Sequence, residues 1–263
     1  MKQHNEARIQ LIYENLSQTE RTHQAIPSIT EAYPDLTVEE AYQIQIVGIE
    51  KKLESGHGIV GKKIGLTSVA MQELLGVNQP DYGHLLDNMK VSNRGSVRLN
   101  ELFQPKIEAE IAFILKKDLE GPNITIEDVI DATDYIVPAL EIVDSRIMDW
   151  KIKLADTIAD NASSGLFVLG DHKFSIDTVD LPLVEMELFR NGELMNTGVG
   201  SAVLGNPSTC VAWLASALSK YEVKLKAGEV ILSGALSAAI PAGKGDQFTA
   251  KFKGLGDVEI SFF

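Results

Sequence analysis

The chain has 263 residues, of which 44% are hydrophobic and 23% are charged, and its formal net charge at pH 7 is −13. This composition suits a folded globular protein and argues against disorder, while the excess negative charge argues against binding to nucleic acid. The sequence contains no apolar run of about 18 residues that would span a membrane, and its polar N-terminus lacks a signal-peptide core. We therefore expect a cytoplasmic protein with neither a nucleic-acid nor a membrane partner.

The first part of the chain has the pattern of helices. Thr37 and Glu40 have the spacing of a capping box, and the run behind them continues to the glycine-rich residues 56–58. We expect a helical N-terminal portion of about residues 1–58 and a β-rich body of about residues 59–263. The two portions are expected to belong to one domain.

The sequence changes character after residue 58. Residues 59–66, IVGKKIGL, are β-branched and bounded by glycines, which predicts a strand. Ser68 is a suitable cap for a short helix over residues 69–76. The next segment, NQPDYG at 78–83, has the composition of a loop.

Two strand-like apolar runs occupy the middle of the chain, IEAEIAFIL at 107–115 and IVPALEIV at 136–143. Between them, Thr125 and Asp128 are placed to cap a helix over residues 127–135. Neither strand opens a helix through a GxGxxG segment, so a dinucleotide-binding fold is not indicated.

Strands dominate the C-terminal part of the sequence. Asn191-Gly192 is a strong signal for a tight hairpin turn, and one helix is predicted over about residues 208–221. The single cysteine, Cys210, lies in this helix and is expected to be a buried small hydrophobe. Further strands are predicted at 229–234, 246–254 and 257–263. The whole pattern predicts an α+β fold.

Three glutamates form a candidate cation site. Because side chains alternate along a strand, Glu108 and Glu110 share one face, about 6–7 Å apart at Cα, while the alternate residues form an apolar face. Glu141 ends a second apolar run, where a buried acid would need a partner. Carboxylates without histidine or cysteine suit a hard cation such as Mg²⁺ or Mn²⁺. The alternative is an edge strand whose outer face is solvated.

The lysine pair in GKKIG is a second candidate. Lys62 and Lys63 point to opposite faces of the predicted strand, so one is expected at the surface and the other inward. An inward lysine would supply positive charge, or would act as an acid or base if burial lowers its pKa. The alternative is two surface lysines on an edge strand.

A small, polar, turn-prone segment at 159–165, ADNASSG, is a third candidate. Its hydroxyl and backbone N–H groups are suited to surround an anion, although an ordinary Asx-turn has the same composition. Arg146 follows Glu141 closely and is expected to neutralise a neighbouring carboxylate, either Asp144 or one of the glutamates.

Several segments together resemble a known family. They are IVGKKIGLTS, LGVNQPDYG, QPKIEAEIAFILKKDLEGP, PALEIVDSRIMDWKIKLADTIADNASSGLFVLGD, CVAWLA and KAGEVILSGAL, in that order. The sequence is similar to the 2-oxopent-4-enoate (2-hydroxypenta-2,4-dienoate) hydratases and the related 4-oxalocrotonate (2-oxo-3-hexenedioate) decarboxylases. Both groups resemble the C-terminal domain of fumarylacetoacetate hydrolase. The resemblance extends from about residue 35 to the end.

The resemblance implies a mixed β-roll or sandwich body decorated with helices, in a single catalytic domain that forms homo-oligomers. It implies Mg²⁺ or Mn²⁺ as cofactor. The residues that match the family's functional positions are the metal ligands Glu108, Glu110 and Glu141, the catalytic residues Lys63 and Asp81, and the substrate-binding residues Ser163 and Leu66, the last through its backbone N–H.

The resemblance implies a lyase that acts on a small anionic 2-hydroxy-dienoic acid in the meta-cleavage of aromatic compounds. GKKIG, QPDYG, DSRIMDWKIK and CVAWLA look like a hydratase, whereas ITEAYPDLTVEEAY and LSAAIPAGKGD look more like a decarboxylase. A decarboxylase substrate carries a second carboxylate, but Lys63 is the one clear inward lysine, and Arg146 is the only other cation of the motif segments that is expected near it. We therefore expect the hydratase, and its expected partners include the decarboxylase of the pathway. A decarboxylase and a non-catalytic binding or scaffold protein are the alternatives.

Overall fold

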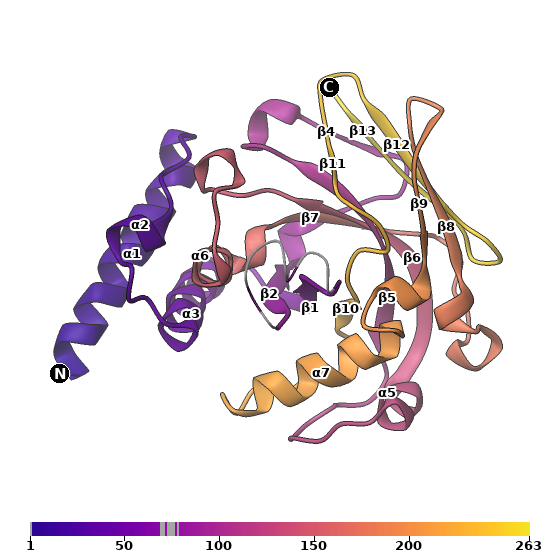
Figure 1. Cartoon of the computed structure of the whole chain (residues 1–263), viewed down its shortest axis with the longest axis horizontal. Coiled ribbons are helices and arrows are strands. Elements are labelled where there is room, and N and C mark those ends of the chain that lie inside the picture. Colours follow the sequence, from indigo (N-terminus) through magenta and orange to yellow (C-terminus); the bar gives the residue numbers. More distant parts are fainter. Residues whose placement is uncertain (1, 69–71, 73–76, 78) are drawn as a thin grey trace.

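The structure is a computed structural model that describes residues 2–68, 72, 77 and 79–263 (Figure 1). Its eight-stranded sheet has the order β2-β1-β10-β5-β6-β7-β3, with β11 paired to β5, and its five-stranded sheet has the order β4-β13-β12-β8-β9. The strands of the larger sheet are β1 (Ile59–Gly65), β2 (Asp81–Leu86), β3 (Lys90–Val91), β5 (Lys106–Leu115), β6 (Thr133–Val143), β7 (Ser164–Leu169), β10 (Val230–Leu232) and β11 (Ile240–Pro241). Those of the smaller sheet are β4 (Gly95–Val97), β8 (Glu185–Arg190), β9 (Glu193–Val199), β12 (Gln247–Phe252) and β13 (Gly256–Phe262).

The α-helices with described bounds are α1 (Lys2–Thr22), α2 (Ile29–Ala32), α3 (Val38–Glu54), α5 (Ile126–Ala132), α6 (Leu154–Ala159) and α7 (Pro207–Ser219). Figure 1 shows α1, α2 and α3 gathered on one side of the molecule and the sheets on the other, with α7 and α5 along the lower edge. Most strand pairs are antiparallel and a few are parallel. The predicted α+β class is therefore confirmed. Among the described residues, no helix has the length and apolar character needed to cross a membrane.

Local sequence signals account for the ends of several elements. Both predicted capping boxes are present: Thr37 accepts a hydrogen bond from the Glu40 amide, and Thr125 accepts one from the Asp128 amide. The hairpin turn at Asn191-Gly192 is also confirmed, with positive φ values of 54° and 82°.

Two local predictions were wrong. The helix expected up to residue 135 ends at Ala132, because Thr133 and Tyr135 pair with β5 and begin β6. The loop expected over 78–83 becomes strand from Asp81 onward, because residues 81–83 pair antiparallel with β1. The predicted helix over 69–76 lies outside the described residues, except for Gln72.

The larger sheet separates an apolar face of β5 from a charged one. The odd-numbered residues of this strand pack in the main core, where they are fully buried: Ile107, Ala109, Ile111 and Phe113. On the other face, Glu108 lies opposite Glu141 of β6 in the antiparallel ladder. Farther along this face, Ala112 joins a second apolar cluster with Leu232 of β10. The register of these strands therefore places the two carboxylates side by side, on the same face of the sheet as this apolar cluster.

The helical region is tied to the strand that begins at Asp81. Gln45 of α3 donates hydrogen bonds to the carbonyl oxygens of Tyr82 in β2, at 3.0 Å, and Ile158 in α6, at 2.7 Å. Thr157 of α6 donates a 2.8 Å hydrogen bond to Asp81. Helices α3 and α6 thus hold β2 against β1 and fix the position of Asp81.

Candidate metal and active site

The three predicted glutamates come together on the charged face of the larger sheet. One carboxylate oxygen from each of Glu108, Glu110 and Glu141 lies within 4.8 Å of the other two. Glu110 and Glu141 are buried and Glu108 is half-buried. The alternative of a solvated edge strand was wrong, because β5 lies between β10 and β6 inside the sheet.

Burial makes negative charge costly at this cluster. It raises the pKa of Glu141 to about 7, although nearby Lys63 acts in the opposite direction. Burial also raises the pKa of Glu110 well above its ordinary value, and repulsion from Glu141 and Glu108 adds to the effect. Burial raises the pKa of Glu108 against the opposing attraction of Lys63. The three carboxylates would therefore be stabilised in their charged forms by an additional cation.

The hydrogen bonding of the cluster leaves several oxygens open. Glu110 accepts a 2.8 Å hydrogen bond at Oε2 from the amide of Gly234, just beyond β10. Within the described part of the chain, Oε1 of Glu110 and Oε2 of Glu141 have no hydrogen-bond partner, and Oε1 of Glu141 lies 3.3 Å from the Lys63 ammonium. Buried polar atoms are rarely left unpaired. Open carboxylate oxygens at this spacing fit a hard divalent cation that prefers oxygen ligands.

Lys63 is the cation that the chain itself brings to the cluster. Its ammonium group lies 3.3 Å from Oε1 of Glu141 and donates a 2.9 Å hydrogen bond to the carbonyl of Ala162. Burial alone would lower the pKa of Lys63, but four surrounding carboxylates outweigh burial and raise this pKa above its ordinary value. The expected inward lysine is confirmed. The idea that burial would lower its pKa was wrong, because it ignored the nearby negative charges.

Lys62 differs from the predicted surface lysine. It is buried and donates hydrogen bonds of 2.8 and 2.7 Å to the two carboxylate oxygens of Glu229. The two lysines contact different groups, as alternation along β1 requires. The edge-strand alternative also fails, because β1 lies between β2 and β10.

Asp81 lies beside Lys63 at the start of β2. Its Oδ2 atom accepts the hydrogen bond from Thr157, and burial raises its pKa while Lys63 opposes this shift. A Cβ atom at Gly65 would lie only 2.2 Å from Oδ1 of Asp81 and 3.2 Å from the Lys63 amine. The glycine of β1 therefore leaves the space in which these two charged groups meet.

Ser163 and Leu66 flank the same region with unusual backbone conformations. Ser163 is buried, has a φ of 52°, and its hydroxyl has no hydrogen-bond partner among the residues with described positions. Leu66 directly follows β1 with a φ of 56°, and its carbonyl accepts a 2.8 Å hydrogen bond from Gln72. The proposed use of the Leu66 amide stays a prediction.

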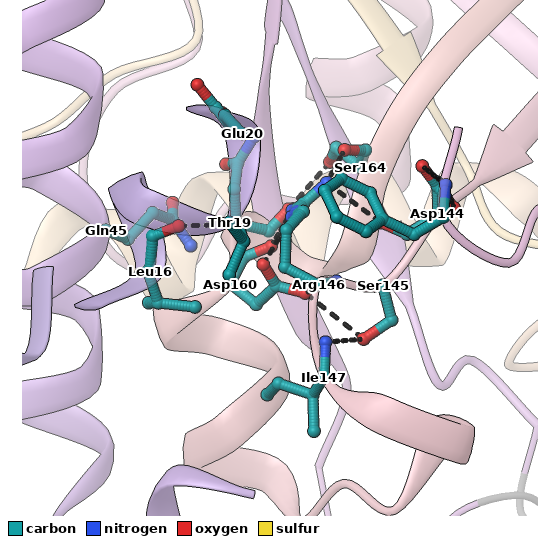
Figure 2. Close-up of polar contacts among 12 residues, drawn as sticks. Leu16, Thr19, Glu20, Gln45, Asp144, Ser145, Arg146, Ile147, Asp160 and Ser164 are labelled. Carbon is teal, nitrogen blue, oxygen red and sulfur yellow. Dashed lines mark hydrogen bonds and ion pairs between the residues drawn. The ribbon is translucent and has the colours of Figure 1, made fainter. Parts of the chain in front are cut away.

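Arg146 neutralises a carboxylate, as expected, but the partner is Asp160 rather than Asp144. Its Nε atom lies 2.5 Å from Oδ1 of Asp160 (Figure 2). The Asp144 side chain instead accepts hydrogen bonds from the amides of Phe103 and Gln104.

Sequence reasoning missed a second lysine on the charged face. Lys106 lies two residues before Glu108 on β5, and its amine is 4.1 Å from the centre of the Trp150 ring. Burial lowers the pKa of Lys106, against the opposing attraction of Glu108. The alternation that placed Glu108 and Glu110 on one face applies equally to Lys106, so the signal was present. The expectation that Lys63 and Arg146 were the only nearby cations was wrong.

Comparisons with known proteins agree on one family. The Fumarylacetoacetate (FAA) hydrolase C-terminal family profile matches residues 83–262. The chain is 45% identical over 263 residues to the 2-hydroxyhexa-2,4-dienoate hydratase of Comamonas testosteroni, covering 99% of this chain and 98% of the relative. It is 45% identical over 249 residues to the 2-keto-4-pentenoate hydratase of Paraburkholderia xenovorans, covering 95% and 93% of the two chains.

A solved structure is also similar over nearly the whole length. It is the 4-oxalocrotonate decarboxylase from Pseudomonas putida G7, complexed with magnesium and adipate. The TM-score is 0.95 at 37% sequence identity, and the alignment covers 98% of each chain.

Proposed function

The chain belongs to the fumarylacetoacetate hydrolase C-terminal family and is an enzyme of the lyase class, and we propose that it hydrates 2-hydroxypenta-2,4-dienoate to 4-hydroxy-2-oxopentanoate. The observation that carries this proposal is the convergence of Glu108, Glu110 and Glu141 beside Lys63. A small 2-oxo acid is an anion, and these groups provide both a cation site and a fixed ammonium to receive it.

Glu108, Glu110 and Glu141 would hold a divalent cation, Mg²⁺ or Mn²⁺. The open oxygens of Glu110 and Glu141 support this role, as does the magnesium in the structurally similar decarboxylase. When bound, such an ion polarises the oxygens of a 2-oxo acid and stabilises negative charge that develops on them.

The chain's own residues would bind the substrate and move its protons. In the proposed reaction the 2-hydroxyl loses its proton and C5 gains one, which gives 2-oxopent-3-enoate. Water then adds across C3 and C4, with the hydroxyl on C4 and the proton on C3. Lys63 and Ser163 would bind the carboxylate, while Asp81 and Lys63 are the candidates to carry protons. Two atoms without a hydrogen-bond partner among the described residues support these roles. They are Oδ1 of Asp81 and the hydroxyl oxygen of Ser163.

Lys106 favours a second candidate reaction, the decarboxylation of 2-oxo-3-hexenedioate. A dicarboxylate needs a second cation, and Lys106 lies on the same face of β5 as Glu108. The similar decarboxylase structure contains adipate, which is also a dicarboxylate. If Lys106 binds a distal carboxylate, Lys106→Met should raise KM for the dicarboxylate and leave KM for the monocarboxylate within about twofold.

Product analysis with both substrates at saturating Mg²⁺ tests the proposal. Formation of 4-hydroxy-2-oxopentanoate from 2-hydroxypenta-2,4-dienoate, without CO₂ release from 2-oxo-3-hexenedioate, is the expected result. Rapid CO₂ release without hydration would establish the second candidate instead. A protein that is inactive with both substrates and whose Tm does not change with millimolar Mg²⁺ would point to a binding or scaffold role.

We also propose that the enzyme works as a homo-oligomer in the cytoplasm, with access to the decarboxylase that forms its substrate. An oligomer would bury part of the exposed apolar surface, which includes Leu183, with 69% exposed, and Phe263, with 55%. Light scattering of the purified protein would measure the subunit number, and a monomer at micromolar concentration would contradict the oligomer.

A further inference from the structure

The turn between α6 and β7 has a strained backbone. Asn161, Ala162 and Ser163 have φ values of 53°, 51° and 52°, and none of them is glycine. L-residues rarely adopt this left-handed conformation, and three in succession are exceptional. Such a backbone persists only where surrounding contacts hold it.

Arg146 forms hydrogen bonds with the residues on both sides of this turn. Its Nη2 atom donates a hydrogen bond to the carbonyl of Asp160 at 2.5 Å, and Nη1 donates one to the carbonyl of Ser164 at 2.8 Å. The side chain of Asp160 accepts a further bond from Nε, at 2.5 Å. Figure 2 shows Arg146 between Asp160 and Ser164, with Ser145 also hydrogen-bonded to the Asp160 carboxylate. One partly buried guanidinium therefore spans the three strained residues.

The same turn is fixed to β2 on another side. The side chain of Asn161 accepts a 2.7 Å hydrogen bond from the amide of His84 and donates a 2.9 Å hydrogen bond to its carbonyl. A Cβ atom at Gly83 would lie 2.4 Å from the carbonyl oxygen of Asn161, so the turn packs directly on the strand. These contacts leave the turn little freedom to shift along β2.

The turn presents two groups to the candidate active site. The carbonyl of Ala162 accepts the hydrogen bond from the Lys63 amine. The next residue contributes the buried hydroxyl of Ser163, which has no partner within the described chain. Arg146 itself makes its hydrogen bonds to Asp144, Asp160 and Ser164 and not to the three glutamates.

We propose that Arg146 is a positioning residue that holds the left-handed turn, so that Ala162 orients the Lys63 ammonium and Ser163 directs its hydroxyl toward the substrate. This inference rests on the proposed function, in which Lys63 and Ser163 contact the substrate carboxylate. A relaxed turn would withdraw both groups from the site while the carboxylate cluster on β5 and β6 stays in place.

Arg146→Lys is the primary test, because lysine keeps the charge beside Asp160 but lacks the planar fork of donors with which Arg146 reaches both carbonyl groups. We expect turnover to fall at least about tenfold, by the loss of a positioned group, while Mg²⁺ affinity stays within about twofold. The matched control is Arg94→Lys, because Arg94 makes ion pairs at an exposed site. It should leave both quantities unchanged.

A double-mutant cycle separates positioning from general stability. Ser163→Ala should lower turnover about tenfold in the parent protein and less than about threefold in the Arg146→Lys protein, because the hydroxyl is already misplaced there. Equal losses in the two backgrounds would overturn the proposal. If Arg146→Lys does not fold, Asp160→Asn takes its place in the cycle, because it weakens the ion pair between Arg146 and Asp160.

A crystal structure of Arg146→Lys gives a readout that does not depend on the reaction. Loss of the left-handed conformation at Asn161–Ser163 and of the Lys63 to Ala162 hydrogen bond is expected. An unchanged turn would overturn the proposal even if the hydratase assignment holds. A parent protein that hydrates no dienoate, combined with a relaxed turn in the variant, would instead reject the proposed function and retain the positioning role.

Discussion

Lys62 and Lys63 are adjacent and both buried, but the balance of charge around them differs. Lys62 faces one carboxylate, Glu229, and makes two short hydrogen bonds to it. Glu229 also accepts a 3.0 Å hydrogen bond from the amide of Lys226. Positive and negative charge are matched there, and the polar atoms are satisfied.

Lys63 lies instead among four carboxylates, which include Asp81 and Glu141. Some of the oxygens around it have no hydrogen-bond partner in the described chain. A matched buried pair needs nothing further, whereas an excess of buried negative charge needs another cation. Two adjacent residues of one strand thus belong to different sites, a structural ion pair and a candidate active site. The excess of negative charge distinguishes the second site from the first.

The largest effect is expected from Glu110→Gln. Loss of one carboxylate from the proposed cation site should weaken Mg²⁺ binding and lower turnover at least about 10³-fold, because a bound ion contributes several kcal/mol of charge stabilisation. Titration calorimetry and steady-state kinetics measure the two quantities. Glu229→Gln is the matched control, with turnover per folded molecule unchanged. Unaltered Mg²⁺ affinity in Glu110→Gln, or full activity in excess EDTA, would contradict the site.

Replacement by methionine should lower turnover at Lys63 and the free energy of unfolding at Lys62. Lys63→Met should lower turnover about tenfold or more, as expected for a positioned charge or proton carrier. Lys62→Met should leave turnover per folded molecule within about twofold and lower the free energy of unfolding by about 3–5 kcal/mol, because Glu229 stays buried without its partner. Denaturant unfolding and kinetics on both variants are the measurements. Mild, equal effects at both positions would remove the distinction.

The pH dependence of stability should differ between the metal-free and the metal-bound protein. The pKa of Glu141 is raised by burial from 4.5 to about 7 in the folded protein without metal. Between these values the folded state binds more protons than the unfolded state, so the stability of the metal-free protein should fall as pH rises. Protons compete with the ion for the carboxylate, so Mg²⁺ affinity should drop about tenfold per pH unit below about 7 for each proton displaced.

The pH prediction is checked by measuring Tm in EDTA and in Mg²⁺ from pH 5 to pH 8. The difference between the two Tm values should widen as pH rises. A constant difference over this range would show that no ligand carboxylate titrates there.

The smallest effect is expected from replacing the matched pair as a whole. Lys62→Met combined with Glu229→Leu should change the free energy of unfolding by about 1 kcal/mol or less, because well-packed apolar residues commonly replace a buried ion pair without loss. Turnover should also stay close to that of the parent. A large loss of turnover in this double variant would show that Lys62 has a role in the reaction.

Short-range patterns predicted much of the fold and of the candidate site. Capping boxes at Thr37 and Thr125 depend only on residues three positions apart, and alternation along one strand placed Glu108 and Glu110 together. These features require no knowledge of distant parts of the chain, so the sequence contains the necessary information.

The failures involve partners far away in the sequence. Lys62 was expected at the surface because the residues near it in the sequence offer no partner for a buried lysine. Its partner, Glu229, lies 167 positions later. Asp81 was assigned to a loop from its turn-forming neighbours, and only pairing with β1 makes it a strand residue. The raised pKa of Lys63 likewise depends on carboxylates from three other strands. Contacts between residues far apart in the sequence decide burial and charge balance, and these contacts cannot be read from local composition.

The pairing of Glu108 with Glu141 across β5 and β6 has a consequence for how the chain folds. A slip of one residue between these strands would turn Glu141 toward the apolar core, and a slip of two would carry it about 7 Å away. Either error separates the three carboxylates. An ion that needs all three binds tightly to one alignment of the strands only, and mass action then favours that alignment. The cation would thus act as a folding ligand that selects the correct register before any substrate arrives.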